Sequence, residues 1–162
     1  MSSAPQGPEG PVYPGTCRNL NREIPPGASV AWRLDSQKAA SLTGPLTFRD
    51  LRFGETPVEP QLLGDVVLAR KDIGTAYHLA VVVDDAFQEI THVTRGEDLL
   101  SSTHVHRLLQ ELLGFPEPVY LHHRLMMDEN GKRLAKRNDS LSIASLRAAG
   151  MTAEEMLKKI GD

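Results

Sequence analysis

The sequence predicts an α/β fold whose sheet contains parallel strand pairs. Strand-like apolar runs alternate with segments of helical periodicity through the second half of the chain, as a parallel sheet requires. One run, 79–83, is apolar without interruption, which is typical of a strand covered on both faces. The 162 residues are enough for one domain with its own core.

The first third of the chain is expected to hold short strands and irregular segments. Residues 1–20 are rich in Pro and Gly and predict an irregular lead-in. Residues 21–64 are expected to form a connecting β segment, with strands at 30–34 and 46–53. Turn-forming residues at 54–60 predict a break.

Residues 65–162 are expected to form the α/β sheet itself. A helix is predicted to begin after a cap at Ser101 or Ser102 and to end at Gly114, because leucines recur there at i, i+3, i+4 and i+7. Strands are predicted where apolar or β-branched residues cluster, and two short helices follow: strands at 65–70, 79–83, 90–95 and 119–127, helices at 143–149 and after a capping box at Thr152–Glu155.

Composition narrows the class of protein. The chain has 24% charged residues and a net charge of −3, so a nucleic acid contact would need a local basic patch. The single cysteine, Cys17, allows no intrachain disulfide and favours a cytoplasmic setting. No run of about 18 apolar residues predicts a membrane span, and the N-terminal residues do not follow the pattern of a signal peptide.

Polar side chains stand at the ends of the predicted strands. Arg95 carries a planar guanidinium that pairs bidentately with carboxylates, and Tyr77 offers a hydroxyl. Asp84 and Asp85 follow the predicted strand 79–83, at the edge where open α/β sheets bind ligands. These two carboxylates fit either Mg²⁺ binding or a turn cap with an arginine pair.

Four motifs occur in a characteristic order. They are Tyr13-Pro-Gly-Thr-Cys17, Tyr77 with Arg95, the turn Arg95-Gly-Glu-Asp98, and the basic run Arg133-Leu-Ala-Lys-Arg137. Over roughly residues 11–160 the chain therefore resembles the glutamyl-Q tRNA(Asp) synthetases, a short branch of the class I glutamyl-tRNA synthetase family. The resemblance implies the second half of a Rossmann-like class I catalytic domain with a short helical C-terminal end.

The resemblance also implies substrates and partners. Such enzymes activate glutamate with ATP, for which Mg²⁺ is expected, and transfer it to queuosine of tRNA(Asp). Tyr77 and Arg95 match the glutamate-binding positions, and Glu97 and Asp98 are expected to orient Arg95 or to favour the start of the next helix. The ATP-binding signature loop would comprise Arg133, Leu134, Ala135, Lys136 and Arg137, with Lys136 as the catalytic lysine stabilising phosphate charge.

The resemblance is incomplete at two places. In the family a Tyr and a Cys supply half of a zinc site; Tyr13 and Cys17 match them, but no Cys-x-Cys pair completes the four ligands that zinc normally takes. The His-Ile-Gly-His signature is also absent from the sequence. We therefore expect either the synthetase reaction, incomplete in these residues alone, or a non-catalytic fragment that acts as a ligand-binding module or associates with a separately encoded N-terminal half. A third alternative is a non-functional remnant that folds poorly.

The six histidines are expected to have no metal-binding or general-base role. His104 and His106 are predicted on the polar side of the helix that ends at Gly114. His122 and His123 are adjacent on a predicted strand and should point to opposite faces of the sheet.

Overall fold

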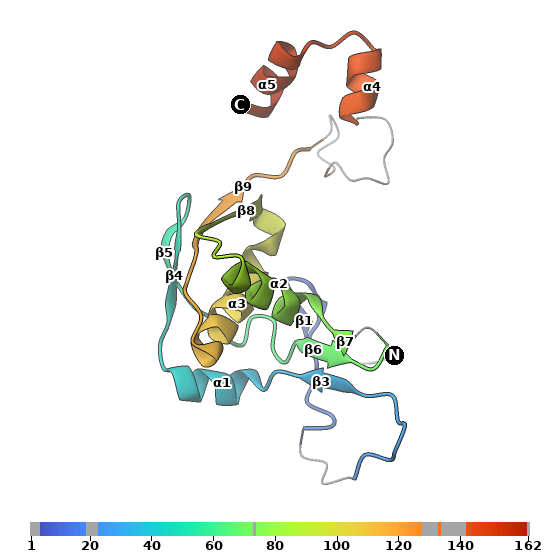
Figure 1. The fold of residues 1–162 in the computed structure, drawn as a ribbon, viewed down its shortest axis with the longest axis vertical. Helices are drawn as coiled ribbons and strands as arrows, with labels where there is room; N and C mark the ends of the chain where they lie inside the picture. The colour runs from blue at the N-terminus through green and yellow to red at the C-terminus, as the bar shows by residue number, and fades with distance from the viewer. Residues whose placement is uncertain (1–3, 19–22, 73, 128–132, 134–141, 162) are drawn as a thin grey trace. The chain divides into compact units, whose positions relative to one another are not determined.

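The structure is a computed structural model that describes residues 4–18, 23–72, 74–127, 133 and 142–161 (Figure 1). It divides into two compact units, Met1–His123 and Arg124–Asp162.

The first unit contains a four-stranded sheet in the order β5-β4-β9-β8. Strands β4 and β8 both run parallel to β9, which lies between them, and β5 is antiparallel to β4. The α/β prediction with parallel strand pairs is therefore confirmed. The bounds are β4 Thr47–Asp50, β5 Gly54–Pro57, β8 His92–Gly96 and β9 Val119–His123.

Two smaller antiparallel sheets accompany the larger one. They are formed by β3 (Ala31–Arg33), β6 (Val67–Arg70) and β7 (Gly74–Thr75), and by β1 (Gln6–Gly7) with β2 (Gly10–Pro11). The strands predicted within 30–34, 65–70 and 90–95 correspond to β3, β6 and β8 and are confirmed.

Helix α3 (Leu100–Leu113) organises the core of the first unit. It contacts β4, α1 (Ser36–Thr43) and α2 (Tyr77–Phe87), and α2 in turn contacts β6. Its apolar stripe supplies Val105 and Leu109 to the buried cluster, and Gly114 ends the helix in the left-handed conformation at φ 66°, as predicted. The buried apolar cluster comprises Leu34, Ala39, Leu63, Val82, Val105 and Leu109.

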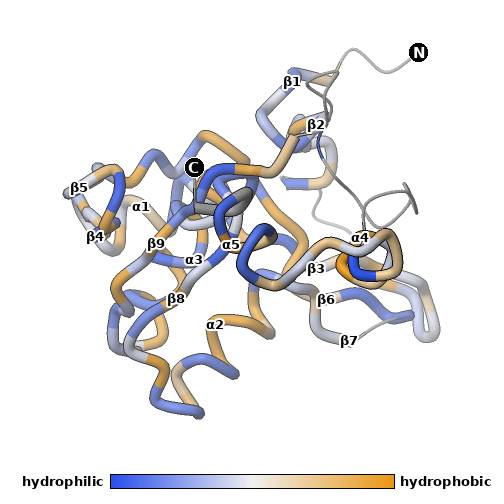
Figure 2. Tube along the Cα trace, turned by 90° about the horizontal axis from the view of Figure 1, so that it is seen from above, coloured by the Kyte–Doolittle hydropathy of each residue, from blue (hydrophilic) through white to orange (hydrophobic). Residues whose placement is uncertain are grey.

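The strand predicted at 79–83 is wrong, because these residues form the middle of helix α2. A short apolar run has no periodicity that separates a buried strand from a buried helix, and packing overrides the strand preference of its valines. Figure 2 shows α2 as a largely hydrophobic segment. Helical spacing places His78, Val82 and Asp85 on one face, whereas Phe87 is 86% exposed.

Three smaller predictions also need correction. The stretch 54–60 contains β5 rather than only a break, and the predicted strand 119–127 ends at His123. Helix α3 does not begin with a serine cap: it continues from the 3₁₀ turn η1 (Glu97–Leu99), and the hydroxyls of Ser101 and Ser102 both donate to Glu9 at 2.6 Å.

The second unit contains two short helices. Helix α4 (Ile143–Ala148) starts after Ser142, whose hydroxyl accepts from the Ser145 backbone N–H, and α5 (Ala153–Gly161) follows. The predicted capping box is confirmed: the Thr152 N–H donates to Glu155 at 2.8 Å and the Glu155 N–H donates to the Thr152 hydroxyl at 3.2 Å. Across the described residues of the chain, no helix is both long and apolar enough to span a membrane.

Candidate functional site

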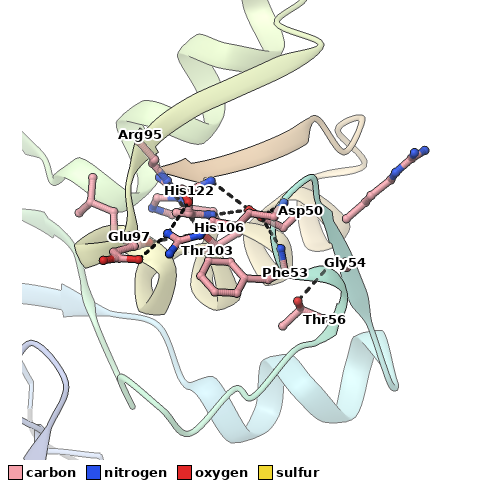
Figure 3. Close-up of polar contacts among 12 residues, drawn as sticks. Asp50, Phe53, Gly54, Thr56, Arg95, Glu97, Thr103, His106 and His122 are labelled. Atoms are coloured by element: carbon pink, nitrogen blue, oxygen red, sulfur yellow. Dashed lines mark hydrogen bonds and ion pairs between the residues drawn. The ribbon is translucent and has the colours of Figure 1, made fainter. Parts of the chain in front are cut away.

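Arg95 lies near the carboxyl end of β8, beside β9, and neutral side chains hold its guanidinium (Figure 3). Its Nε donates to Nε2 of His122 at 3.1 Å, and its Nη1 donates to Nδ1 of His106 at 3.1 Å. Its Nη2 donates to the hydroxyl of Thr103. The guanidinium carbon also lies 5.3 Å from the centroid of the Tyr120 ring. The arginine is thus oriented without being neutralised by these partners.

The contacts with Arg95 reveal the tautomers of both histidines. A guanidinium only donates, so His122 Nε2 and His106 Nδ1 must be acceptors. His122 therefore carries its proton on Nδ1 and donates to Oδ2 of Asp50, 2.6 Å away. His106 carries its proton on Nε2, which faces Nδ1 of His78 at 3.2 Å. Both rings bound to Arg95 are consequently neutral.

Burial keeps these histidines uncharged. The His106 side chain is 2% exposed, and burial together with the Arg95 charge lowers its pKa to about 2. Burial also lowers the pKa of His122, although the hydrogen bond with Asp50 acts in the opposite direction. The pKa of His78 is lowered by the same cause.

Asp50 is the last residue of β4, and its two carboxylate oxygens have separate partners. Oδ1 accepts from the backbone N–H groups of Arg52 at 2.8 Å and Phe53 at 3.0 Å, which closes the turn after β4. Oδ2 accepts from the His122 ring and from the His122 backbone N–H at 3.2 Å. Burial alone would raise the pKa of Asp50, but the hydrogen bonds from His122, Arg52 and Phe53 lower it overall, so the group is an anion.

Tyr77 contacts His106, the same buried histidine that accepts a hydrogen bond from Arg95. It is the first residue of α2, its side chain is 49% exposed, and its ring centroid lies 5.6 Å from that of His106. Tyr77 and Arg95, which belong to different elements, therefore both contact one buried histidine.

A hollow of about 310 Å³ opens beside Tyr77 and His78. The Glu9 carboxylate, the Tyr13 ring and the Arg33 side chain contribute to its lining, with Arg33 lying over the Tyr13 ring at 4.3 Å. The exposed face of Tyr77 thus borders a space large enough for a small polar ligand.

Asp84 and Asp85 do not stand at the end of a strand, because both belong to α2. Burial raises the pKa of Asp85, and the charge of Arg95 acts in the opposite direction, so this carboxyl group lies near enough to sense the arginine. Among the described residues, no three His, Cys, Asp or Glu side chains are grouped to hold a metal ion.

Zinc does not fit the surroundings of Tyr13 and Cys17. The Tyr13 hydroxyl accepts the Cys17 backbone N–H at 2.6 Å, and Cys17 is exposed. A structural zinc site takes four ligands, whereas within the described part of the chain Cys17 belongs to no group of three His, Cys, Asp or Glu side chains that could hold a metal ion. The neighbouring Arg18 pairs with Asp65.

The predicted ATP loop is described only at its first residue. Arg133 forms an isolated antiparallel bridge with Met127, and Leu134, Ala135, Lys136 and Arg137 lie outside the described residues. Glu97, which was considered as a partner of Arg95, is in the first turn of η1 and pairs with Arg52.

The sequence did not reveal the partners of Arg95. His104 and His106 were expected on a polar helix face, but both are buried, and this prediction is wrong. One sequence feature could have revealed them: three polar residues recur at i, i+3 and i+7 of α3, namely Thr103, His106 and Gln110. This polar row faces the sheet. His122 is buried and His123 is exposed, so their placement on opposite faces is confirmed.

A parallel sheet that presents an oriented arginine at a strand end is consistent with the family comparison. The family model described as "tRNA synthetases class I (E and Q), catalytic domain" matches residues 16–161, and the chain belongs to this family. Within it, the chain is a homologue of the glutamyl-Q tRNA(Asp) synthetases. It is 47% identical to the one from Rhodobacter capsulatus over 99% of this chain and 60% of the relative.

Other relatives agree. The glutamyl-Q tRNA(Asp) synthetase of Symbiobacterium thermophilum is 42% identical over 97% of this chain and 49% of the relative. The crystal structure of glutamate-tRNA synthetase from Elizabethkingia anophelis superposes with a TM-score of 0.52 at 35% identity, covering 61% of this chain and 20% of that chain. The chain thus spans 60% or less of the length of these proteins. These findings confirm the resemblance and the fold class.

Proposed function

We propose that these residues form the glutamate-binding part of a glutamyl-Q tRNA(Asp) synthetase. Tyr77 and Arg95 bind glutamate, and the loop 133–137 binds ATP with its Mg²⁺, with Lys136 against the phosphates. A carboxylate oxygen of glutamate attacks the α-phosphorus of ATP, which gives glutamyl adenylate and pyrophosphate. The glutamyl group is then transferred to queuosine of tRNA(Asp), with release of AMP.

The orientation of Arg95 is the observation that supports this proposal. Its contacts with His122, His106 and Thr103 use three of the five guanidinium N–H donors. One N–H remains on each of Nη1 and Nη2, so the guanidinium keeps two donors that a carboxylate can accept. The ion pairs found within the described residues do not include Arg95, so its charge is available to a ligand.

The reaction requires one carboxylate of glutamate to stay reactive. Arg95 therefore holds the carboxylate that does not attack ATP, and the hydroxyl of the half-exposed Tyr77, whose ring contacts His106, supplies a further hydrogen bond. Holding the substrate at two points converts the attack on ATP into a step within one oriented complex.

Two measurements test the proposal. Calorimetric titration of glutamate into the chain should show binding that Arg95→Gln weakens by at least about tenfold, because a charge-assisted pair is lost. Glutamate-dependent ATP–pyrophosphate exchange should disappear in Lys136→Ala. Arg70→Gln is the matched control, since Arg70 is exposed and paired with Asp72. Glutamate binding that is equal in wild type and Arg95→Gln would refute the role of Arg95.

A second candidate function is glutamate binding without chemistry. It is favoured for these 162 residues by the lack of a His-Ile-Gly-His signature in them. Binding that depends on Arg95, with no exchange in the wild-type chain, would support this ligand-binding module. Exchange that depends on Lys136 would support the enzyme.

A further inference from the structure

We infer that Asp50 is a positioning residue for the ligand-binding arginine: it dictates the tautomer of His122, and His122 in turn orients Arg95. This inference rests on the proposed function only for the identity of the ligand. The line of contacts itself, Asp50 to His122 to Arg95, is a feature of the sheet (Figure 3).

The three residues come from three adjacent strands. Asp50 ends β4, His122 lies in the central strand β9, and Arg95 stands opposite His122 in β8. Asp50 Oδ2 lies 2.6 Å from His122 Nδ1, and His122 Nε2 lies 3.1 Å from Arg95 Nε. Asp50 is 2% exposed and His122 is 0% exposed, so water does not compete for either contact.

The chemistry of the end groups leaves one arrangement of protons. An ionised carboxylate only accepts, and a guanidinium only donates. The imidazole between them must therefore donate through Nδ1 and accept through Nε2. With the proton on Nε2 instead, the ring would present a donor to the Nε–H of Arg95 and a bare nitrogen to the carboxylate, and both contacts would be lost.

The distribution of contacts on Asp50 argues that it does more than close a turn. Oδ1 alone receives the backbone N–H groups of Arg52 and Phe53, so one oxygen is sufficient for the turn. Oδ2 serves only His122, through the ring and the backbone N–H. The second oxygen is thus dedicated to the histidine that contacts Arg95.

Asp50→Asn separates the two roles. The Asn carbonyl oxygen can still accept the two turn N–H groups, whereas the amide N–H₂ that replaces Oδ2 donates to His122 Nδ1 and moves the ring proton to Nε2, and the His122 backbone N–H loses its acceptor. We expect long-range ¹⁵N–¹H NMR spectra to show His122 as Nδ1–H in the wild type and Nε2–H in the variant. The Nε–H signal of Arg95 should lose its hydrogen-bonded shift, and glutamate affinity should fall about 10–100-fold, by analogy with the loss caused by mutating residues that orient metal ligands.

The matched control is Asp72→Asn, the same chemical change at an exposed aspartate that pairs with Arg70. It should leave the His122 signals and glutamate affinity unchanged. An Nε2–H or doubly protonated His122 in the wild type would overturn the inference, and this result does not require the variant to fold. An Arg95 Nε–H signal that is the same in wild type and Asp50→Asn would also overturn it. If the signals switch but neither protein binds glutamate, the positioning of Arg95 stands and the proposed function fails.

Discussion

Two regions of the first unit each place an arginine near a buried aspartate, but they connect the pair differently. Near the N-terminal segment, Arg18 donates directly to Asp65, through Nε at 3.1 Å and through Nη2. In the four-stranded sheet, Arg95 reaches Asp50 only through the neutral ring of His122. A direct pair neutralises the arginine, whereas a neutral relay orients it and leaves its charge for a ligand.

The surroundings of the two aspartates agree with this difference. Asp65 also accepts the backbone N–H and the hydroxyl of Ser36, both at 3.0 Å, so it joins residue 18 to the start of α1. The pKa of Asp65 is lowered because these hydrogen bonds and the Arg18 guanidinium outweigh its burial. Asp65 therefore has a structural role, whereas Asp50 belongs to the proposed glutamate-binding site.

Among the predicted effects, the largest is a loss of folding stability at low pH, which arises from the buried histidines around Arg95. The pKa of His106 is about 2 when folded, well below the ordinary value of about 6.5, so at pH below 6.5 the unfolded chain binds a proton that the folded chain does not. Stability is therefore highest above pH 6.5 and falls as the pH falls, by about 1.4 kcal/mol per pH unit for this histidine. The lowered pKa values of His78, His104 and His122 act in the same direction, and the raised pKa of Asp85 opposes them only at lower pH.

Urea unfolding at pH 7.5, 6.5 and 5.5 measures this slope. We expect His106→Gln to flatten it, because the variant removes the buried titrating group. The exposed His92→Gln is the control and should leave the slope as it is. A free energy of unfolding that stays constant from pH 7.5 to 5.5 would show that the cluster around Arg95 is charged or hydrated.

A substitution that gives Arg95 a direct carboxylate partner, as Arg18 has in Asp65, tests the difference between the two regions. His106→Glu places a carboxylate where Arg95 now has a neutral acceptor, so the arginine would pair directly and lose its charge to the protein. We expect glutamate affinity to fall by about 100-fold, corresponding to about 2.7 kcal/mol. Calorimetry with His106→Gln as the uncharged counterpart measures the effect. Equal affinities of the Glu and Gln variants would contradict the idea that neutral partners preserve the charge.

The direct pair should matter for stability and not for the ligand. Asp65→Asn removes the anion that Arg18 and Ser36 share, and we expect a loss of about 2 kcal/mol, below the usual cost of breaking a buried pair because the Arg18 side chain is 31% exposed. Chemical denaturation measures this loss. Glutamate affinity, after correction for the folded fraction, should remain that of the wild type; a specific decrease in affinity would place Asp65 in the site.

The smallest expected effect is at Tyr77. Tyr77→Phe keeps the ring contact with His106 and removes only the hydroxyl of this half-exposed residue, so glutamate affinity should fall about fivefold, the value of one hydrogen bond of about 1 kcal/mol. Thermal melting should not change. An unchanged affinity would mean that only the ring of Tyr77 contributes.

Local patterns predicted much of the fold. The leucine stripe of α3, its glycine end and the Thr152–Glu155 box each depend on residues within a few positions of one another, and all are present. Helix α2 was missed because its apolar run carries no period and its boundaries lack a capping side chain.

The residues of the candidate site also fall into two groups, those that the sequence predicted and those that it did not. Tyr77 and Arg95 were found through a motif resemblance. Asp50 and His122 were not found, because they meet only through the parallel pairing of β4 with β9, which brings together residues 72 positions apart. Thr103 was not found because its contact with His122 depends on the packing of α3 against the sheet. No sequence window contains that information.

The contacts from Asp50 through His122 to Arg95 constrain which substitutions this sheet can accept during evolution. His122 accepts from Arg95 only while position 50 supplies an acceptor to its other nitrogen. A replacement at either position is therefore harmful alone and tolerated when the other changes with it. Positions 50 and 122 should vary jointly among homologous proteins, although neither is expected to touch the substrate.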